Sequence, residues 1–268
     1  MKLEGAHVVV TGASRGIGEA LARAFAGEGA RVALVARSAD VIEAMAIELE
    51  GTAHSADLTD RAQVAGLIER VDAEGGPIDV LVNNAALAPA GDYLHQDPDE
   101  IDRIYQLNLV TPVQLCRQIV PRMLARGRGH IVNVSSMVAA FSFPGLTAYA
   151  SSKSGLTHFH FSLQLDLKDS CVGTTLVELG PVRTGMLDLG MQSTPTGDAF
   201  RRLFRLHVLV ELRPEKVANA VLRAVRRGKP HVRLPRRAAL LPLLANLPRQ
   251  AAAAVLSARS GRPVARAG

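Results

Sequence analysis

Two side chains that can exchange a proton, Tyr149 and Lys153, stand four positions apart in a segment with helical character. Residues at i and i+4 share one face of a helix, so the phenol and the ammonium are expected to lie side by side. A free tyrosine, with a pKa of about 10, stays protonated at neutral pH and is a poor base. Because a nearby positive charge lowers that pKa, the pair is predicted to form an acid/base centre.

Two further polar residues precede this pair. Ser136 lies 13 residues before Tyr149, just past an apolar run that is predicted to be a strand, and its hydroxyl can hydrogen-bond a substrate oxygen. Asn108 lies 41 residues before Tyr149. Each residue also has a simpler explanation when it is taken alone. Ser136 could belong to an ordinary turn at the end of a strand, Asn108 could cap a helix, and the spacing of Tyr149 and Lys153 could arise by chance. Together the four residues favour a catalytic set.

A glycine-rich segment near the start of the chain has the character of a phosphate-binding turn. Residues 11–18 read TGASRGIG, between a predicted buried strand at 6–11 and a predicted helix at 16–28. A tight turn requires glycine, and the start of a helix offers free N–H groups and a positive dipole. The spacing is G-x-x-x-G-x-G, not G-x-G-x-x-G, and a purely structural turn is the alternative. Its place between a first strand and a first helix favours a dinucleotide pyrophosphate.

The residues after the second predicted strand bear on the choice of nicotinamide cofactor. A carboxylate at that point would bind both ribose hydroxyls and favour NAD. This chain instead has Arg37 and Ser38, and Arg15 in the glycine segment can reach the same group. Two guanidiniums and a hydroxyl suit a 2′-phosphate, which predicts NADP(H) with NAD(H) left open as a second cofactor. The alternative is that both arginines are solvated surface residues.

In this order, the motifs resemble the short-chain dehydrogenase/reductase family. The resemblance runs from about residue 6 to residue 227 and rests on Thr11–Gly18, Asp57-Leu58, Asn83-Asn84-Ala85-Ala86, Asn108, Ser136 and Tyr149–Lys153. It implies direct hydride transfer between nicotinamide C4 and a carbonyl carbon while Tyr149 donates or accepts the proton, without a metal. It also implies that Lys153 holds the nicotinamide ribose and that Asn108 anchors a water of a proton relay.

The resemblance further implies the cofactor contacts. Asp57 and Leu58 are expected at the adenine, Asn84 along the groove, and Val182 and Thr184 at the carboxamide. The full predicted set is Gly12, Ser14, Arg15, Gly16, Ile17, Gly18, Arg37, Ser38, Asp57, Leu58, Asn84, Tyr149, Lys153, Val182 and Thr184. The chain departs from the family pattern at Leu179, where proline is usual, and at Ala86, where glycine is usual, and both changes concern loop geometry.

Alternating strand and helix patterns predict one α/β domain with a parallel sheet covered on both faces. The resemblance implies that this sheet is of the Rossmann type, doubly wound, with about seven strands. The expected strands are 6–11, 31–36, 52–55, 78–82, 129–135, 172–178 and 231–234, and the expected helices are 16–28, 39–49, 60–73, 98–107, 111–125, 148–168 and 214–227. The domain is assigned to residues 1–228, and the resemblance implies that residues 185–212 form a lid over the substrate. Residues 229–268 are assigned to a basic, amphipathic C-terminal extension.

The lid is apolar, which predicts a lipophilic substrate such as a steroid, a retinoid, a long-chain ketone or an acyl group. Its apolar residues are Met186, Leu187, Leu189, Met191, Phe200, Leu203, Phe204, Leu206, Val208, Leu209 and Val210, and Phe141, Phe143 and Leu146 are expected at the same pocket. The alternative is that half of them only pack the lid on the body. Two other functions stay open: a 3-oxoacyl carrier-protein reductase and a non-catalytic NADP(H)-sensing interaction protein.

Charge divides the chain unevenly. Residues 1–200 hold 15 Lys and Arg against 23 Asp and Glu, a net charge of −8, whereas residues 201–268 hold 16 against two, a net charge of +14. Arginines beside the leucine-rich pieces of residues 235–258 favour peripheral contact with an anionic membrane. A subunit interface or an acidic carrier protein are alternatives. Nucleic acid is disfavoured, because the segment lacks stacking aromatics and a recognisable motif.

The remaining expectations concern compartment and assembly. Cys116 and Cys171 are expected to be free, buried thiols in a reducing cytosol, and no cysteine or histidine cluster predicts a metal site. The start of the chain lacks the apolar run of a signal peptide, and no stretch reaches the ~20 apolar residues of a spanning helix. We therefore expect a cytoplasmic protein, or alternatively a cytoplasmic protein that contacts the membrane peripherally. The resemblance implies a homo-oligomer, a dimer or a tetramer, formed through the helix that carries Tyr149.

Overall fold

The computed structural model describes residues 1–192, 194–207 and 209–235. Its centre is a parallel sheet of seven strands in the order β3-β2-β1-β4-β5-β6-β7. The strands are β1 (His7–Thr11), β2 (Arg31–Ala36), β3 (Thr52–Ser55), β4 (Val80–Asn83), β5 (Gly129–Ser136), β6 (Val172–Leu179) and β7 (His231–Leu234). The predicted doubly wound, Rossmann-type α/β fold is confirmed.

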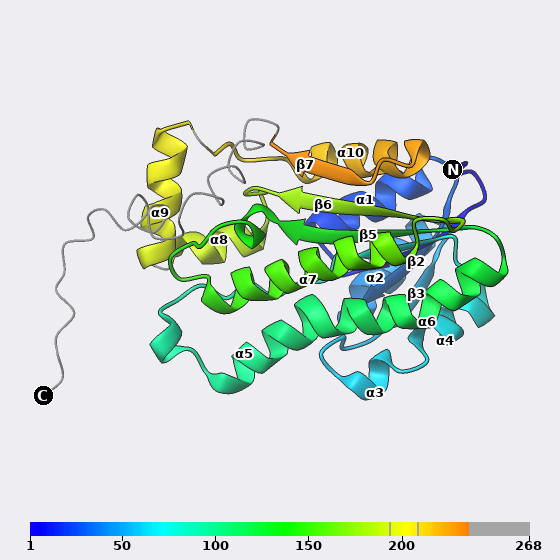
Figure 1. The fold of residues 1–268 in the computed structure, drawn as a ribbon. Helices are drawn as coiled ribbons and strands as arrows, with labels where there is room; N and C mark the ends of the chain where they lie inside the picture. The colour runs from blue at the N-terminus through cyan, green and yellow to red at the C-terminus, as the bar shows by residue number, and fades with distance from the viewer. Residues whose placement is uncertain (193, 208, 236–268) are drawn as a thin grey trace, which may run out of the picture.

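Helices cover both faces of this sheet (Figure 1). They are α1 (Gly16–Ala26), α2 (Ala39–Glu48), α3 (Arg61–Val64), α4 (Leu67–Gly75), α5 (Pro98–Tyr105), α6 (Thr111–Ala125), α7 (Thr147–Asp166), α8 (Gly185–Gln192), α9 (Thr194–Arg205) and α10 (Pro214–Arg227). One core joins the sheet to α1, α2 and α10, and a second joins it to α4, α6 and α7. Neighbouring strand residues alternate between them, since Val8 and Val10 enter the first core and Val9 the second. Both faces are buried, which explains why the strands are apolar runs.

Three details differ from the expectations. The helix predicted from Asp60 is broken at Gly66, whose φ of +66° lies in the left-handed region and separates α3 from α4. Cys116 is buried as expected, but Cys171 is exposed because it lies in the turn before β6, so the prediction of two buried thiols is wrong for it. The sheet includes β7, which lies within the segment assigned to the extension, so the fold reaches Leu234. The predicted membrane-contacting segment, apart from its first residue, lies outside the described residues.

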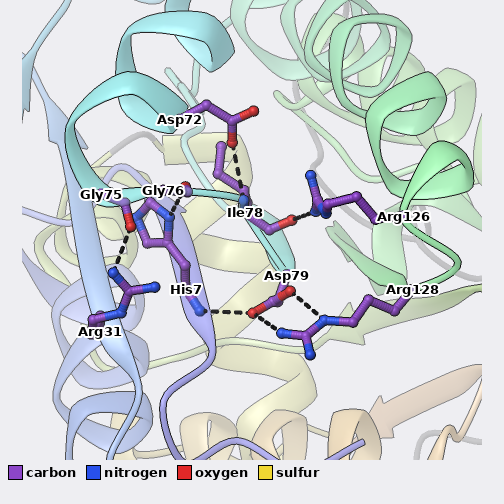
Figure 2. A network of polar contacts seen from close by, with 9 residues as sticks. All are labelled: His7, Arg31, Asp72, Gly75, Gly76, Ile78, Asp79, Arg126 and Arg128. Atoms are coloured by element: carbon purple, nitrogen blue, oxygen red, sulfur yellow. Dashed lines mark hydrogen bonds and ion pairs between the residues drawn. The ribbon is translucent and has the colours of Figure 1, made fainter.

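A polar network joins the amino ends of the strands, at the edge opposite the glycine segment (Figure 2). The Asp79 carboxylate accepts hydrogen bonds from the backbone N–H of His7 at 3.1 Å and from Nε of Arg128 at 2.8 Å. Nδ1 of His7 lies 2.6 Å from the carbonyl oxygen of Gly76. Burial lowers the pKa of His7. Since these contacts link β1 to the segments before β4 and β5, the network stabilises the sheet and leaves the other edge for chemistry.

Candidate active site

The glycine segment lies where the strand order reverses, between β1 and β4, and ligands of such sheets bind beside this point. Nδ2 of Asn84, after β4, donates to the carbonyl oxygen of Thr11 at 2.9 Å and to that of Gly12 at 3.3 Å. The Thr11 hydroxyl in turn accepts from the N–H groups of Asn84 and Ala85. These bonds hold the two loops together and shape one wall of the cavity.

Two glycines make this turn sterically feasible. Gly12 has a φ of +67°, and a Cβ there would lie 2.8 Å from Cα of Ala85. A Cβ on Gly18 would lie 2.0 Å from the carbonyl oxygen of Gly12. No side chain fits between the loop and the first turn of α1, so the loop packs closely on the start of that helix, where the first N–H groups have no intrahelical partners. This cradle fits the pyrophosphate of a dinucleotide.

A single cavity of about 850 Å³ runs from the glycine segment to the lid. All fifteen residues of the predicted cofactor set line it, from Gly12 after β1 to Thr184 before α8. Ser136 lines it as well. Figure 1 shows that α8 and α9 lie beyond the carboxyl ends of β5 and β6. Met186 and Leu187 of α8 and Phe200 of α9 line the cavity. The structure therefore brings together, in one cleft, residues that are more than 170 positions apart in the sequence.

One end of the cavity carries unpaired positive charge. Arg15 and Arg37 are exposed and line the cavity, and within the described part of the chain neither guanidinium has a hydrogen-bond or ion-pair partner. Ser38 lies beside Arg37, at the start of α2. Asp57 lies after β3, and although burial opposes it, hydrogen bonds from Thr59 keep the pKa of this carboxyl low. This end can hold an adenosine with a phosphate on its ribose.

The phenol of Tyr149 and the hydroxyl of Ser136 meet further along the cavity. Ser136 ends β5, and Tyr149 lies in the first turn of α7, packed against the apolar cluster of Val138, Phe143 and Leu146. Burial raises the pKa of Tyr149, and a hydrogen bond with Ser136 opposes this rise only in part. The lowered pKa that the Tyr–Lys spacing predicts is therefore wrong for this arrangement, because desolvation of the phenolate outweighs the groups that stabilise it.

Lys153 lies one turn after Tyr149 on α7, and its side chain is 3% exposed. Its Nζ donates a hydrogen bond to the carbonyl oxygen of Val134 at 2.9 Å. Burial lowers the pKa of Lys153 to about 7. An amine so close to half-ionisation at neutral pH can release a proton as readily as take one up, which suits a group near a reacting oxygen.

Asn108 lies outside the cavity wall and has no exposed surface. It belongs to a π-helical turn, η2 (Gln106–Val110), that joins α5 to α6. Its amide is fully engaged: Oδ1 accepts from the N–H of Leu87, and Nδ2 donates to the carbonyl oxygen of Leu87 and to Oγ of Ser152. The residue thus ties the loop after β4 to α7, one residue from Lys153.

Comparison with known proteins agrees with this architecture. The sequence profile of the family described as short chain dehydrogenase matches residues 6–192. The chain belongs to this family. A "Short chain dehydrogenase" of Pseudocercospora fijiensis is 35% identical over 191 residues, 68% of this chain and 62% of that protein. A solved metagenomic short-chain oxidoreductase, described in complex with NADP, is 31% identical, with a TM-score of 0.70 over 87% of this chain and 97% of its own.

Some relatives of this short-chain dehydrogenase are considerably longer. The "Probable oxidoreductase EphD" of Mycobacterium tuberculosis is 34% identical over 83% of this chain, yet that stretch covers only 40% of its length. The chain thus spans less than two thirds of the first curated relatives that it matches. The match therefore does not assign the substrates of those longer proteins to this chain.

The sequence did not predict a group of residues that position α7, the helix that carries Tyr149 and Lys153. Oγ of Ser135 donates to the backbone carbonyl of Lys153 at 3.2 Å and lies 2.7 Å from Oγ1 of Thr157. Ser152 bridges the carbonyl oxygen of Tyr149 and the amide of Asn108. The only signal in the sequence is that Ser135 and Ser152 each adjoin a motif residue, which does not reveal their partners.

Proposed function

We propose that the protein is an NADP(H)-dependent oxidoreductase that interconverts the carbonyl and alcohol forms of a lipophilic substrate. The observation that carries the proposal is the continuous cavity, which holds a dinucleotide cradle at one end and Tyr149, Ser136 and Lys153 near the other. Family membership supports the reaction class. The structure adds the way in which this chain's own residues would perform it.

Tyr149 acts as the proton donor or acceptor in this proposal. When bound, a nicotinamide supplies or accepts the hydride. Ser136 donates a hydrogen bond to the substrate oxygen and holds it beside the phenol. Because the pKa of Tyr149 is raised by burial, the phenol keeps its proton at neutral pH and can deliver it to a carbonyl oxygen. Lys153 sits behind it and can replace the proton. In the reduction of a carbonyl the phenol gives up this proton, and in the oxidation of an alcohol the same steps run in reverse.

NADP(H) is the preferred cofactor, with NAD(H) as the second. Arg15 and Arg37 lie at the ribose end of the cavity without protein partners among the described residues, and Ser38 adds a hydroxyl. A phosphate accepts charge-assisted hydrogen bonds from guanidinium groups, whereas NAD would leave both charges unmatched. The solved relative that is described with NADP supports this preference.

A lipophilic substrate fits the other end of the cavity. Apolar side chains from the lid line it, including Met186, Leu187 and Leu209, and they face Val138 and Leu146 from the body. Such a surface gains free energy from apolar groups and offers little to a polar one. Not every apolar residue of the lid takes part, since Leu189 and Leu206 are exposed.

Two associations accompany this function. Phe161 and Leu165 are exposed on α7, which suits a homo-oligomer formed through that helix. If the oligomer forms in this way, Leu165→Glu should lower the molecular mass that light scattering measures.

In the part of the chain that the structure describes, every helix is too short or too polar to span a bilayer. The basic segment beyond Pro235 is proposed to contact anionic membranes. Deleting residues 236–268 should reduce binding to anionic vesicles, and equal binding by both forms would reject the idea.

A substrate screen tests the function itself. Oxidation of NADPH is followed at neutral pH with steroid, retinoid, 3-oxoacyl and simple ketone panels, and NADH is measured in parallel. The proposal expects turnover with at least one lipophilic ketone and a higher kcat/KM with NADPH than with NADH. Turnover confined to small polar carbonyls, or equal use of both cofactors, would contradict it.

A further inference from the structure

Four of the seven phenylalanines in the chain form one continuous row, and three of them, Phe141, Phe143 and Phe200, line the substrate end of the cavity. Phe141 and Phe143 lie in the loop between Ser136 and Tyr149, with ring centroids 6.4 Å apart. Phe143 lies 4.6 Å from Phe200 on α9, and Phe200 lies 6.1 Å from Phe204. The row therefore crosses from the catalytic body to the lid.

A second contact fixes the lid at the same place. Oγ1 of Thr196, at the start of α9, donates to the carbonyl oxygen of Pro144 at 3.0 Å. The next residue, Gly145, has a φ of +72°, and a Cβ there would lie 2.2 Å from that Oγ1 atom. The side chain of Thr196 on α9 thus packs directly on the backbone of the loop. Phe200, one helical turn after Thr196, is held at a set position relative to Tyr149.

Charge is nearly absent from this end of the cavity. Among the described lining residues beyond the cofactor set, the only charged side chain is Arg183, and its guanidinium pairs with Glu211 at 3.0 Å. Lys153 also lines the cavity near Tyr149, but it is buried and its Nζ is held by the carbonyl oxygen of Val134. A substrate carboxylate or phosphate would therefore find no exposed, unpaired cation there, and its desolvation would be poorly compensated. The site therefore selects against anionic substrates.

We propose that Phe143 and Phe200 are the specificity-determining residues, and that they select neutral carbonyl compounds whose apolar part is a flat aromatic ring. This rests on the proposed function and names its substrate class. Aromatic rings pack on one another in tilted or offset arrangements with centroids about 4.5–7 Å apart. The row already shows such spacings, with the Phe143 and Phe200 planes tilted by 38°. A substrate ring would extend the row toward Tyr149, placing the carbonyl at the phenol.

Two measurements on the full chain test this assignment. The first is binding of N-phenyl-1-naphthylamine, a neutral aromatic fluorophore without a carbonyl, in the presence of NADP⁺. Phe143→Leu and Phe200→Leu should each raise its Kd about tenfold. Phe200→Tyr, which keeps the ring, should restore binding, and Ile47→Ala, which changes an exposed side chain on α2, should have no effect. Equal binding by the wild type and both leucine variants would overturn the assignment.

The second measurement compares reduction of acetophenone with that of cyclohexyl methyl ketone, its non-aromatic counterpart. Phe200→Leu should lower the ratio of the two kcat/KM values, mainly through the KM for acetophenone. An equal loss on both ketones would indicate a merely structural role and would also overturn the assignment. If no ketone is reduced but the binding results are as stated, the proposed function fails while the aromatic site stands.

Discussion

Nζ of Lys153 donates to the carbonyl oxygen of Val134 at 2.9 Å, inside the body of the protein and almost without contact with water. The hydrogen bond anchors the amine, which comes from the helix that carries Tyr149, to the backbone of β5. Burial nevertheless penalises the ammonium and lowers the pKa of Lys153 to about 7. The Lys153 amine is thus held in a defined position, and its charged form lowers the stability of the folded protein.

The desolvation penalty of the Lys153 ammonium predicts that the free energy of unfolding depends on pH. Below pH 7 the lysine is charged in both states, and the full penalty is present. Between pH 7 and about 10.4 the unfolded chain binds more protons, so the wild type gains stability as pH rises. Lys153→Met should therefore melt at least about 2 °C above the wild type at pH 6, with a gap that narrows by pH 9. Calorimetry across this range, with the exposed Lys229→Met as control, would contradict the account if the gap stayed constant.

Arg37→Asp should change cofactor choice. The substitution removes a guanidinium from the ribose end of the cavity and supplies a carboxylate that can bind ribose hydroxyls. The kcat/KM for NADPH should fall about tenfold or more, while that for NADH rises. Steady-state kinetics with both cofactors measure the ratio, and Arg227→Asp, on α10 outside the cavity, serves as the charge-matched control. An unchanged ratio in Arg37→Asp would mean that Arg37 does not contact the phosphate.

Gly18→Ala should damage the cofactor cradle more than the rest of the fold. The new Cβ would lie 2.0 Å from the carbonyl oxygen of Gly12, so the loop must move away from α1. The Kd for NADPH, measured by calorimetry, should rise at least about tenfold. Gly91→Ala is the control, because a Cβ there would meet nothing within 4 Å. NADPH affinity equal to that of the wild type would show that the close approach is not required.

Two buried histidines predict acid sensitivity. Burial lowers the pKa values of His130 and His160 to about 4. Between pH 6.5 and 4 the unfolded chain takes up protons that the folded chain refuses, so stability falls as pH falls through this window. The melting temperature should drop between pH 7 and pH 5, and His130→Gln with His160→Gln should flatten the slope. His158→Gln, at an exposed position, should leave the slope as it is. The prediction fails if the double variant and the wild type show equal slopes.

The sequence predicted the sheet and its seven strands because the central strands are short apolar runs between glycines or polar turns, whereas the edge strand at residues 52–55 is mostly polar. Residues 52–55 and 231–234 match the predicted strand bounds. It could not predict the π-helical turn at 106–110 or the break at Gly66, because both depend on packing against distant segments and leave no periodic signal. The lid was predicted as an apolar segment without helices, although α9 is strongly amphipathic and its sequence therefore carries a helical signal.

The site was predicted to a similar extent. The cofactor residues line one cavity because their motifs follow parallel strands, whose carboxyl ends meet at one edge. The raised pKa of Tyr149 was not foreseen, since a spacing of four residues carries no information about desolvation. Nor could sequence show that Asn108 is fully engaged by Leu87 and Ser152, because those partners come from other elements.

The most direct test of the account is Tyr149→Phe, assayed for turnover and for cofactor binding with the same preparation. The variant keeps the ring that packs on Phe143 and Leu146 and loses only the hydroxyl. The account predicts that kcat falls at least about 100-fold while the Kd for NADPH stays within about twofold of the wild type. Turnover near the wild-type rate, with NADPH bound, would contradict the assignment of Tyr149 as the acid/base.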